Sequence, residues 1–151
     1  MEAVRRNYLR IIFWTLTGII ACAIFLFSHQ SGAESSEISG GITEYLSQIL
    51  KINDPEMLGR IVRKGAHFTE YLCLGASLFS AISCTWDFIF KAVVAHLGAT
   101  VYALSDEVHQ YFVPERVCAL TDVMIDASGA LVGVIIAWLI FYIIKKRRSA
   151  A

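Results

Sequence analysis

This sequence of 151 residues has little proline, no closely paired cysteines and no net charge. Its 13 Lys and Arg residues balance 13 Asp and Glu residues, and no basic stripe with interleaved aromatic residues occurs, which argues against nucleic acid as a partner. The four cysteines form no Cys-x-x-Cys pair, which argues against a zinc ribbon or a redox pair. No tight metal-ligand motif, repeat or low-complexity tract is present, and we expect no metal and no other cofactor.

Hydrophobic residues, by contrast, are abundant and lie in long blocks. They make up 56% of the chain, above the 45–50% that is usual for soluble domains. Blocks of this length match the roughly 20 residues that a helix needs to cross a bilayer. We therefore predict an all-α, multi-pass membrane protein with one domain, residues 1–151, and about four transmembrane helices, at about 11–28, 67–86, 88–105 and 127–144.

The charges between these blocks predict the orientation of the helices. With both termini in the cytoplasm, the cytoplasmic segments hold eight Lys and Arg residues and two acids. The outer segments then hold five Lys and Arg residues and eleven acids. Because cations are retained on the cytoplasmic side, we expect both termini inside and the protein in the cell membrane.

The outer segment at about 36–66 carries apolar residues at helical spacing, which is typical of an amphipathic helix lying on the membrane interface. Gly40 and Gly41 weaken this prediction. Asp54 and Pro55 form a good helix start, as N-cap and first helical residue. One long helix could therefore run from Pro55 through the second span, and Pro114 predicts a turn in the other outer segment.

Ionisable residues gather at the outer end of the second block. Lys64, His67, Glu70 and Tyr71 are three or four residues apart and share one helix face. A charged group in hydrocarbon is costly, so these side chains should face protein or water. The alternative is that Lys64, His67 and Glu70 simply neutralise one another at the helix mouth.

A second polar group ends the third block. Asp106, His109 and Gln110 share one helix face, and Glu107 adjoins Asp106. Adjacent acids often share a proton, bind a cation or pair with arginine, and Arg116 is the expected partner. The alternative is a solvated helix end.

The fourth block opens with Asp122 and Asp126, one helical turn apart. Gly129, Gly133 and Ala137 continue the same face, and small residues at this spacing allow close helix packing. The two carboxylates should therefore point inward if the small residues face the other spans.

These stretches resemble the VanZ-like membrane proteins over about residues 27–133. The first signature is Arg63–Tyr71 with Leu74 and Gly75, and the second is Asp106–Arg116 followed by 122–126 and 129–133. The serine-rich stretch 28–39 is also similar.

The sequence departs from that pattern at three positions. Glu115 stands where the family often has Gly, so the turn there is expected to need a non-glycine conformation. Cys118 and Ala119 replace small residues, often Gly or Ser, which removes a hydroxyl contact.

The resemblance implies a bacterial envelope protein that acts on or near cell-wall components, since the founding member confers resistance to teicoplanin-type glycopeptides. The implied partners are membrane lipids and a lipid-linked wall precursor or anionic phospholipid.

Three functions remain open. The first is binding or altering such a component through an outward-facing pocket, in which Arg116 and Lys64 hold an anionic group. The second is an acid/base or metal-assisted enzyme with catalytic candidates His67, Glu70, Asp106, Glu107 and Asp122. The third is a proton-coupled transporter. The predicted pocket residues are Lys64, His67, Glu70, Tyr71, Asp106, Glu107, His109, Gln110, Arg116, Asp122 and Asp126.

Overall fold

The computed structural model describes residues 2–52, 54–116 and 118–149, which contain five α-helices and no strand. The predicted all-α class is confirmed. The helices are α1 (Glu2–Ser28), α2 (Gly32–Leu50), α3 (Pro55–Thr85), α4 (Lys91–Gln110) and α5 (Leu120–Ser149).

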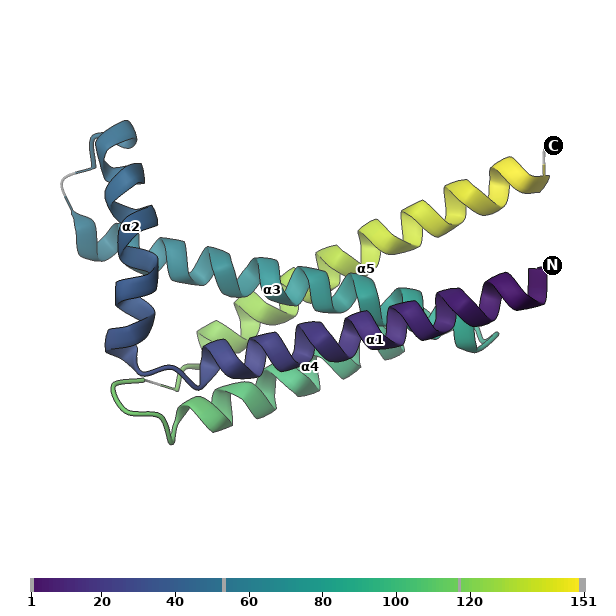
Figure 1. Cartoon of the computed structure of the whole chain (residues 1–151), viewed down its shortest axis with the longest axis horizontal. Helices are drawn as coiled ribbons and strands as arrows, with labels where there is room; N and C mark the ends of the chain where they lie inside the picture. Colours follow the sequence, from purple (N-terminus) through teal and green to yellow (C-terminus); the bar gives the residue numbers. More distant parts are fainter. Residues whose placement is uncertain (1, 53, 117, 150–151) are drawn as a thin grey trace.

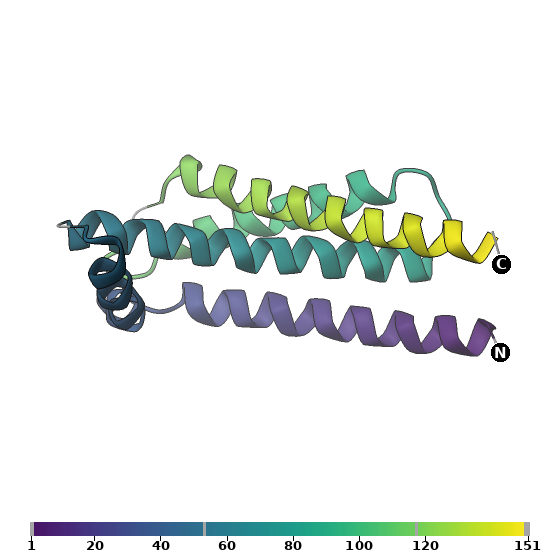
Figure 2. The same cartoon turned by 90° about the horizontal axis from the view of Figure 1, so that it is seen from above.

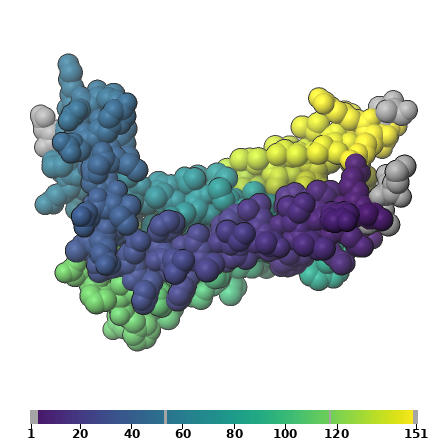
Figure 3. Space-filling model, viewed as in Figure 1, coloured from purple at the N-terminus to yellow at the C-terminus, as the bar shows by residue number. Residues whose placement is uncertain are grey.

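Four helices run along the molecule and one crosses it. Figure 1 shows α1, α3, α4 and α5 along the long axis, with α2 transverse at one end. Both chain termini lie at the opposite end in both views (Figures 1 and 2). We call the end that carries α2 the α2 end, where α2 also stands out from the surface (Figure 3). The central element is α3, because it contacts each of the other four helices.

The long helix predicted from Pro55 is confirmed as α3. The Asp54 carboxylate caps it by accepting a hydrogen bond from the Met57 backbone N–H at 2.9 Å. The outer segment expected at about 36–66 is therefore divided between α2 and the first turns of α3. Gly40 and Gly41 lie within α2 without interrupting it.

The close contact predicted for the small residues of α5 is confirmed against α3. A Cβ atom added to Gly129 would collide with the carbonyl oxygen of Phe68, and one added to Gly133 with that of Leu72. The two backbones thus approach more closely than any side chain would permit.

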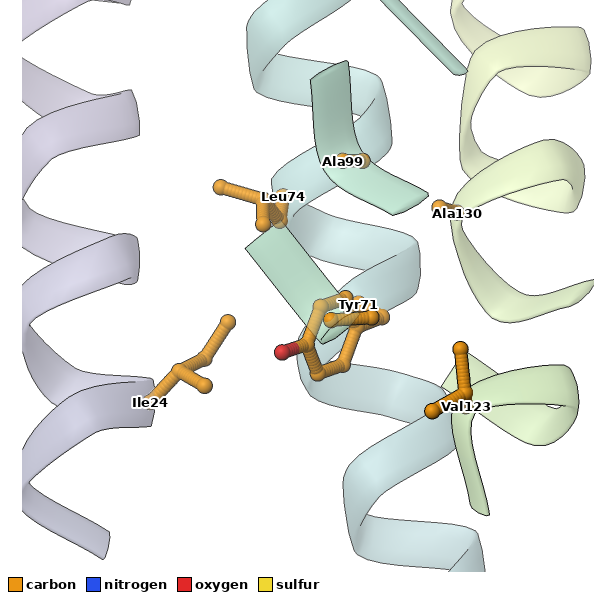
Figure 4. Close-up of a cluster of buried hydrophobic side chains, with 7 residues drawn as sticks. Ile24, Tyr71, Leu74, Ala99, Val123 and Ala130 are labelled. Carbon is orange, nitrogen blue, oxygen red and sulfur yellow. The ribbon is translucent and has the colours of Figure 1, made fainter. Parts of the chain in front are cut away.

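Two buried clusters fill the space between the helices. The first (Figure 4) consists of Ile24, Tyr71, Leu74, Ala99, Ala103, Val123 and Ala130. The second consists of Phe79, Ile82, Ala95, Val134 and Ala137. Alanines supply much of both clusters, so the helices pack closely and the core is thin.

Two helices, Val4–Ser28 and Leu120–Ser149, are long and apolar enough to cross a membrane. They expose many large apolar side chains, including Ile11 and Ile19 on α1 and Ile136 and Leu139 on α5. Within the third predicted span, 88–105, the helix begins only at Lys91, after a short connection.

Candidate functional site

A cavity of about 510 Å³ opens at the α2 end, between α2, α3, α4, α5 and the α4–α5 loop. Its lining is rich in charged side chains and includes the first residues of α2. The lining residues are Gly32, Ala33, Ser35, Ser36, Arg60, Arg63, Lys64, His67, Glu107, Gln110, Glu115, Arg116, Asp122, Ile125 and Asp126.

The structure brings most of the predicted pocket residues to this cavity. Those that line it are Lys64, His67, Glu107, Gln110, Arg116, Asp122 and Asp126. The others lie outside the lining: Glu70, Tyr71, Asp106 and His109. Tyr71 is fully buried in the first core cluster, because residues of α1, α4 and α5 pack around it.

Among the residues that the structure describes, three arginines line the cavity and none of them pairs with a carboxylate. Arg60 and Arg63 come from α3 and Arg116 from the α4–α5 loop. The ion pairs found among residues 2–52, 54–116 and 118–149 involve none of the three. Arg63 donates instead to the Ser36 hydroxyl at 3.1 Å. Burial lowers the pKa of Arg116, and the nearby Arg63 charge lowers that pKa further.

The predicted pairing of Arg116 with Asp106 and Glu107 is wrong. The Arg116 guanidinium donates to the backbone carbonyls of Gln30 at 3.2 Å and Phe27 at 3.4 Å. The last carbonyls of a helix have no partner within it, so the end of α1 competes effectively for this cation.

The two adjacent acids are held by other donors. The Asp106 carboxylate accepts hydrogen bonds from the Ser28 hydroxyl at 2.7 Å and from the Gln110 side chain at 3.2 Å. The predicted common face of Asp106 and Gln110 is confirmed by this contact. The Glu107 carboxylate accepts from the Ala119 backbone N–H at 2.6 Å. These acids therefore join α4 to α1 and to the α4–α5 loop.

The α4–α5 loop is also tied to the start of α2. The Glu115 carboxylate accepts from the Ala33 N–H at 3.1 Å, and the Gly32 N–H donates to the Pro114 carbonyl at 3.2 Å. Glu115 has φ 62°, the left-handed conformation that glycine adopts most readily. The expectation of a non-glycine conformation at Glu115 is therefore wrong, since the turn keeps the glycine-like backbone.

Lys64 and Asp122 form an ion pair across the cavity. Lys64 Nζ lies 2.5 Å from Asp122 Oδ1, and both side chains are partly exposed. His67 Nδ1 lies 3.8 Å from Glu70 Oε2, too far for a good hydrogen bond. Mutual neutralisation of Lys64, His67 and Glu70 therefore does not describe the site, because Lys64 pairs across to α5.

Asp126 forms the inner wall of the cavity. Asp126 is only 3% exposed, and its Oδ1 atom has no hydrogen-bond partner among the described residues. Four more buried atoms nearby share this condition: His67 Nδ1, Glu70 Oε2, Tyr71 Oη and Asp106 Oδ1. Buried polar groups are usually hydrogen-bonded, so such a concentration marks a site rather than ordinary packing.

His109 belongs to a separate contact. His109 Nε2 lies 3.2 Å from His29 Nδ1, and the Phe25 ring packs against both histidine rings. This contact joins α4 to the end of α1 and takes His109 away from the cavity.

Sequence reasoning missed Arg60 and Arg63. Their spacing to Lys64 and His67, three or four residues along a helix that starts at Pro55, places them on one face. This spacing was the signal that could have identified them, if the polar face of the helix had been followed toward its N-terminus. Ser28 was noted only within the serine-rich stretch, and its contact with Asp106 spans 78 residues.

A family model described as VanZ/LLP1 matches residues 13–142, which include all the cavity-lining residues. No curated protein and no solved structure matches the chain.

Proposed function

The chain belongs to the VanZ/LLP1 family, and on that premise we propose that it is a multi-pass envelope protein whose cavity binds a phosphate-bearing lipid. Family membership and the two long apolar helices together indicate a membrane protein. The phosphate would belong to a phospholipid or to a lipid-linked wall precursor.

The proposed topology has α1, α3, α4 and α5 as spans and both termini in the cytoplasm. It is supported by the position of both termini at one end of the bundle (Figure 1). Basic residues flank that end, namely Arg5, Arg6 and Arg10 on α1 and 145–148 on α5. The α2 end then faces outward, and the exposed apolar residues of α2, Ile38, Ile42, Tyr45 and Ile49, would lie in the outer interface.

The observation that carries the proposed binding is the convergence of Arg60, Arg63 and Arg116 on one cavity, with no carboxylate partner in the described part of the chain. Like charges repel one another, so an arrangement of this kind favours an anion between them. Guanidinium groups bind phosphate through paired N–H donors, which gives both affinity and orientation. The cavity volume of about 510 Å³ also lies within the usual range for small-molecule sites.

Binding of phosphatidic acid to the purified full-length chain tests this proposal, with diacylglycerol of the same acyl chains as the matched lipid without phosphate. Of these two lipids, we expect only phosphatidic acid to bind. Arg63→Ala should weaken binding about tenfold, as expected for the loss of a hydrogen bond to a charged group. Arg147→Ala, at the other end of the molecule, serves as the control and should leave binding unchanged. Equal retention of both lipids would exclude phosphate recognition.

We further propose that this binding contributes to teicoplanin-type resistance. The test is expression in a susceptible bacterium and measurement of the inhibitory concentration of teicoplanin. Resistance that persists in Arg63→Ala, at equal protein level, would separate the phenotype from the cavity.

A second candidate function is acid/base catalysis on the same lipid. His67 and Asp126 line the cavity, and each has a buried side-chain atom without a hydrogen-bond partner among the described residues. Mass spectrometry of lipid-linked and phospholipid substrates incubated with the protein distinguishes the two functions. Turnover that His67→Gln abolishes supports the enzyme, and intact substrates support binding alone.

A further inference from the structure

The cavity has two walls of opposite charge. The basic wall consists of Arg60, Arg63, Lys64 and Arg116, from the first turns of α3 and from the α4–α5 loop. The acidic wall consists of Glu107, Asp122 and Asp126, from the end of α4 and the start of α5. A simple phosphate would use only the first wall, so the second requires its own explanation.

Two of the three acids on the acidic wall are already engaged. Glu107 accepts the Ala119 N–H, and Asp122 pairs with Lys64. Asp126 differs, because it is more than nine-tenths buried, lines the cavity, and leaves Oδ1 without a partner among the described residues. A buried polar group in this condition destabilises the fold unless something donates to it.

Resting on the proposed function, we infer that the cavity takes an aminoalkyl phosphodiester, with the phosphate on the basic wall and a primary ammonium at Asp126. The lining contains as many carboxylates as Lys and Arg side chains, counting Glu115 of the α4–α5 loop. A ligand with both charges and no net charge keeps that balance, whereas a lone anion or cation disturbs it.

The contact between Lys64 and Asp122 shows that this wall accepts a primary ammonium. Lys64 Nζ lies 2.5 Å from Asp122 Oδ1, in the geometry that a ligand amine would need at Asp126 one helical turn deeper. A metal ion fits less well, because the described residues contain no suitable group of three His, Cys, Asp or Glu ligands. A trimethylated amine also fits less well, since it has no N–H to donate.

This chemistry has two sources, the headgroup of phosphatidylethanolamine and free glycerophosphoethanolamine, the water-soluble phosphodiester with the same headgroup. The decisive comparison for the lipid is with phosphatidylcholine, which has the same phosphodiester and the same net charge but a trimethylated nitrogen. If free glycerophosphoethanolamine competes with the lipid, the site takes the soluble compound, and if only the lipid binds, the site takes the lipid headgroup. Either result supports the inferred chemistry.

We expect the full-length protein to bind phosphatidylethanolamine about tenfold more tightly than phosphatidylcholine. Asp126→Asn should bring this ratio close to one while phosphatidic acid still binds. Asp87→Asn, a matched change of an exposed aspartate at the opposite end, should keep the preference. If Asp126→Asn does not fold, the comparison of the two lipids on the unaltered chain decides alone.

Equal binding of phosphatidylethanolamine and phosphatidylcholine overturns this inference and leaves the proposed phosphate site in place. A preference that survives in folded Asp126→Asn overturns it as well. Failure of phosphatidic acid and of both zwitterionic lipids to bind better than diacylglycerol overturns the proposed function itself.

Discussion

The carboxylate of Glu115 lies 3.1 Å from the backbone nitrogen of Ala33, so an acidic side chain of the α4–α5 loop covers the start of α2. A helix N-terminus favours negative charge, and here the chain supplies that charge itself. Because Glu115 also lines the cavity, its carboxylate stands close to where we propose that a phosphate binds.

Neutralising Glu115 should therefore tighten phosphate binding. Glu115→Gln keeps an oxygen that can accept the Ala33 N–H but removes a negative charge from the cavity. We expect affinity for phosphatidic acid to rise several-fold, on the order of the 0.5–1 kcal/mol of a partly exposed charge interaction, and the gain to shrink at high salt. Titration of the variant at low and high ionic strength measures this. Unchanged affinity at low salt would place the phosphate away from Glu115.

Packing between α3 and α5 should not tolerate a larger residue at Gly133. A Cβ there would collide with the Leu72 carbonyl, whereas a Cβ at Gly40, within α2, meets no atom within 4 Å. Gly133→Ala should lower the free energy of unfolding by about 1–3 kcal/mol. Gly40→Ala is the control and should be neutral or raise that free energy by up to about 1 kcal/mol, from helix propensity. Thermal unfolding in detergent compares them, and equal midpoints would contradict the close contact.

The start of α2 should loosen in acid. Hydrogen bonds from the Ser31 backbone N–H and then from the Ser31 hydroxyl lower the pKa of Glu34 below its ordinary value. The pKa of Glu34 is lower in the folded than in the unfolded chain. The stability that its hydrogen bonds add is therefore fully present above about pH 4.3 and is lost as the pH falls through the folded pKa. Amide exchange of the first turn of α2 should accelerate over that range. Glu34→Gln should remove this pH dependence, and a variant that retains it would assign the effect to another group.

The proposed topology can be tested with the native cysteines. Cys118 is exposed near the α2 end, and Cys84 is buried. In whole cells of a Cys22→Ser, Cys73→Ser variant, we expect a membrane-impermeant maleimide to label Cys118. As a control, Ser149→Cys in a background without Cys118 should react only after lysis. Labelling of position 149, and not of Cys118, in whole cells would invert the orientation.

Features that depend on neighbouring residues could be predicted from the sequence. Asp54 and Pro55 act within one helical turn, so the start of α3 followed from their identity and order. Gly129 and Gly133 follow the helical period, and this period also predicted the packing face of α5.

Features that depend on distant partners could not be predicted in the same way. The spacing of Arg116 from Glu107 suggested a salt bridge, but the carbonyl oxygens it contacts belong to Phe27 and Gln30, more than 80 residues away. The burial of Tyr71 could not be predicted either, because it depends on how α1, α4 and α5 pack around α3. The three polar stretches indicated a common site, whereas the exact set of lining residues could be known only from the fold.

The length of α3 has a consequence for how a ligand would arrive. Its 31 residues make a rod of roughly 46 Å, while the hydrocarbon layer is about 30 Å thick. An upright α3 therefore extends past the acyl chains into the zone of lipid headgroups, and its first turns carry Arg60, Arg63 and Lys64. A lipid could then be captured sideways from its own leaflet without leaving the bilayer, and the protein would select among neighbouring lipids where they already reside.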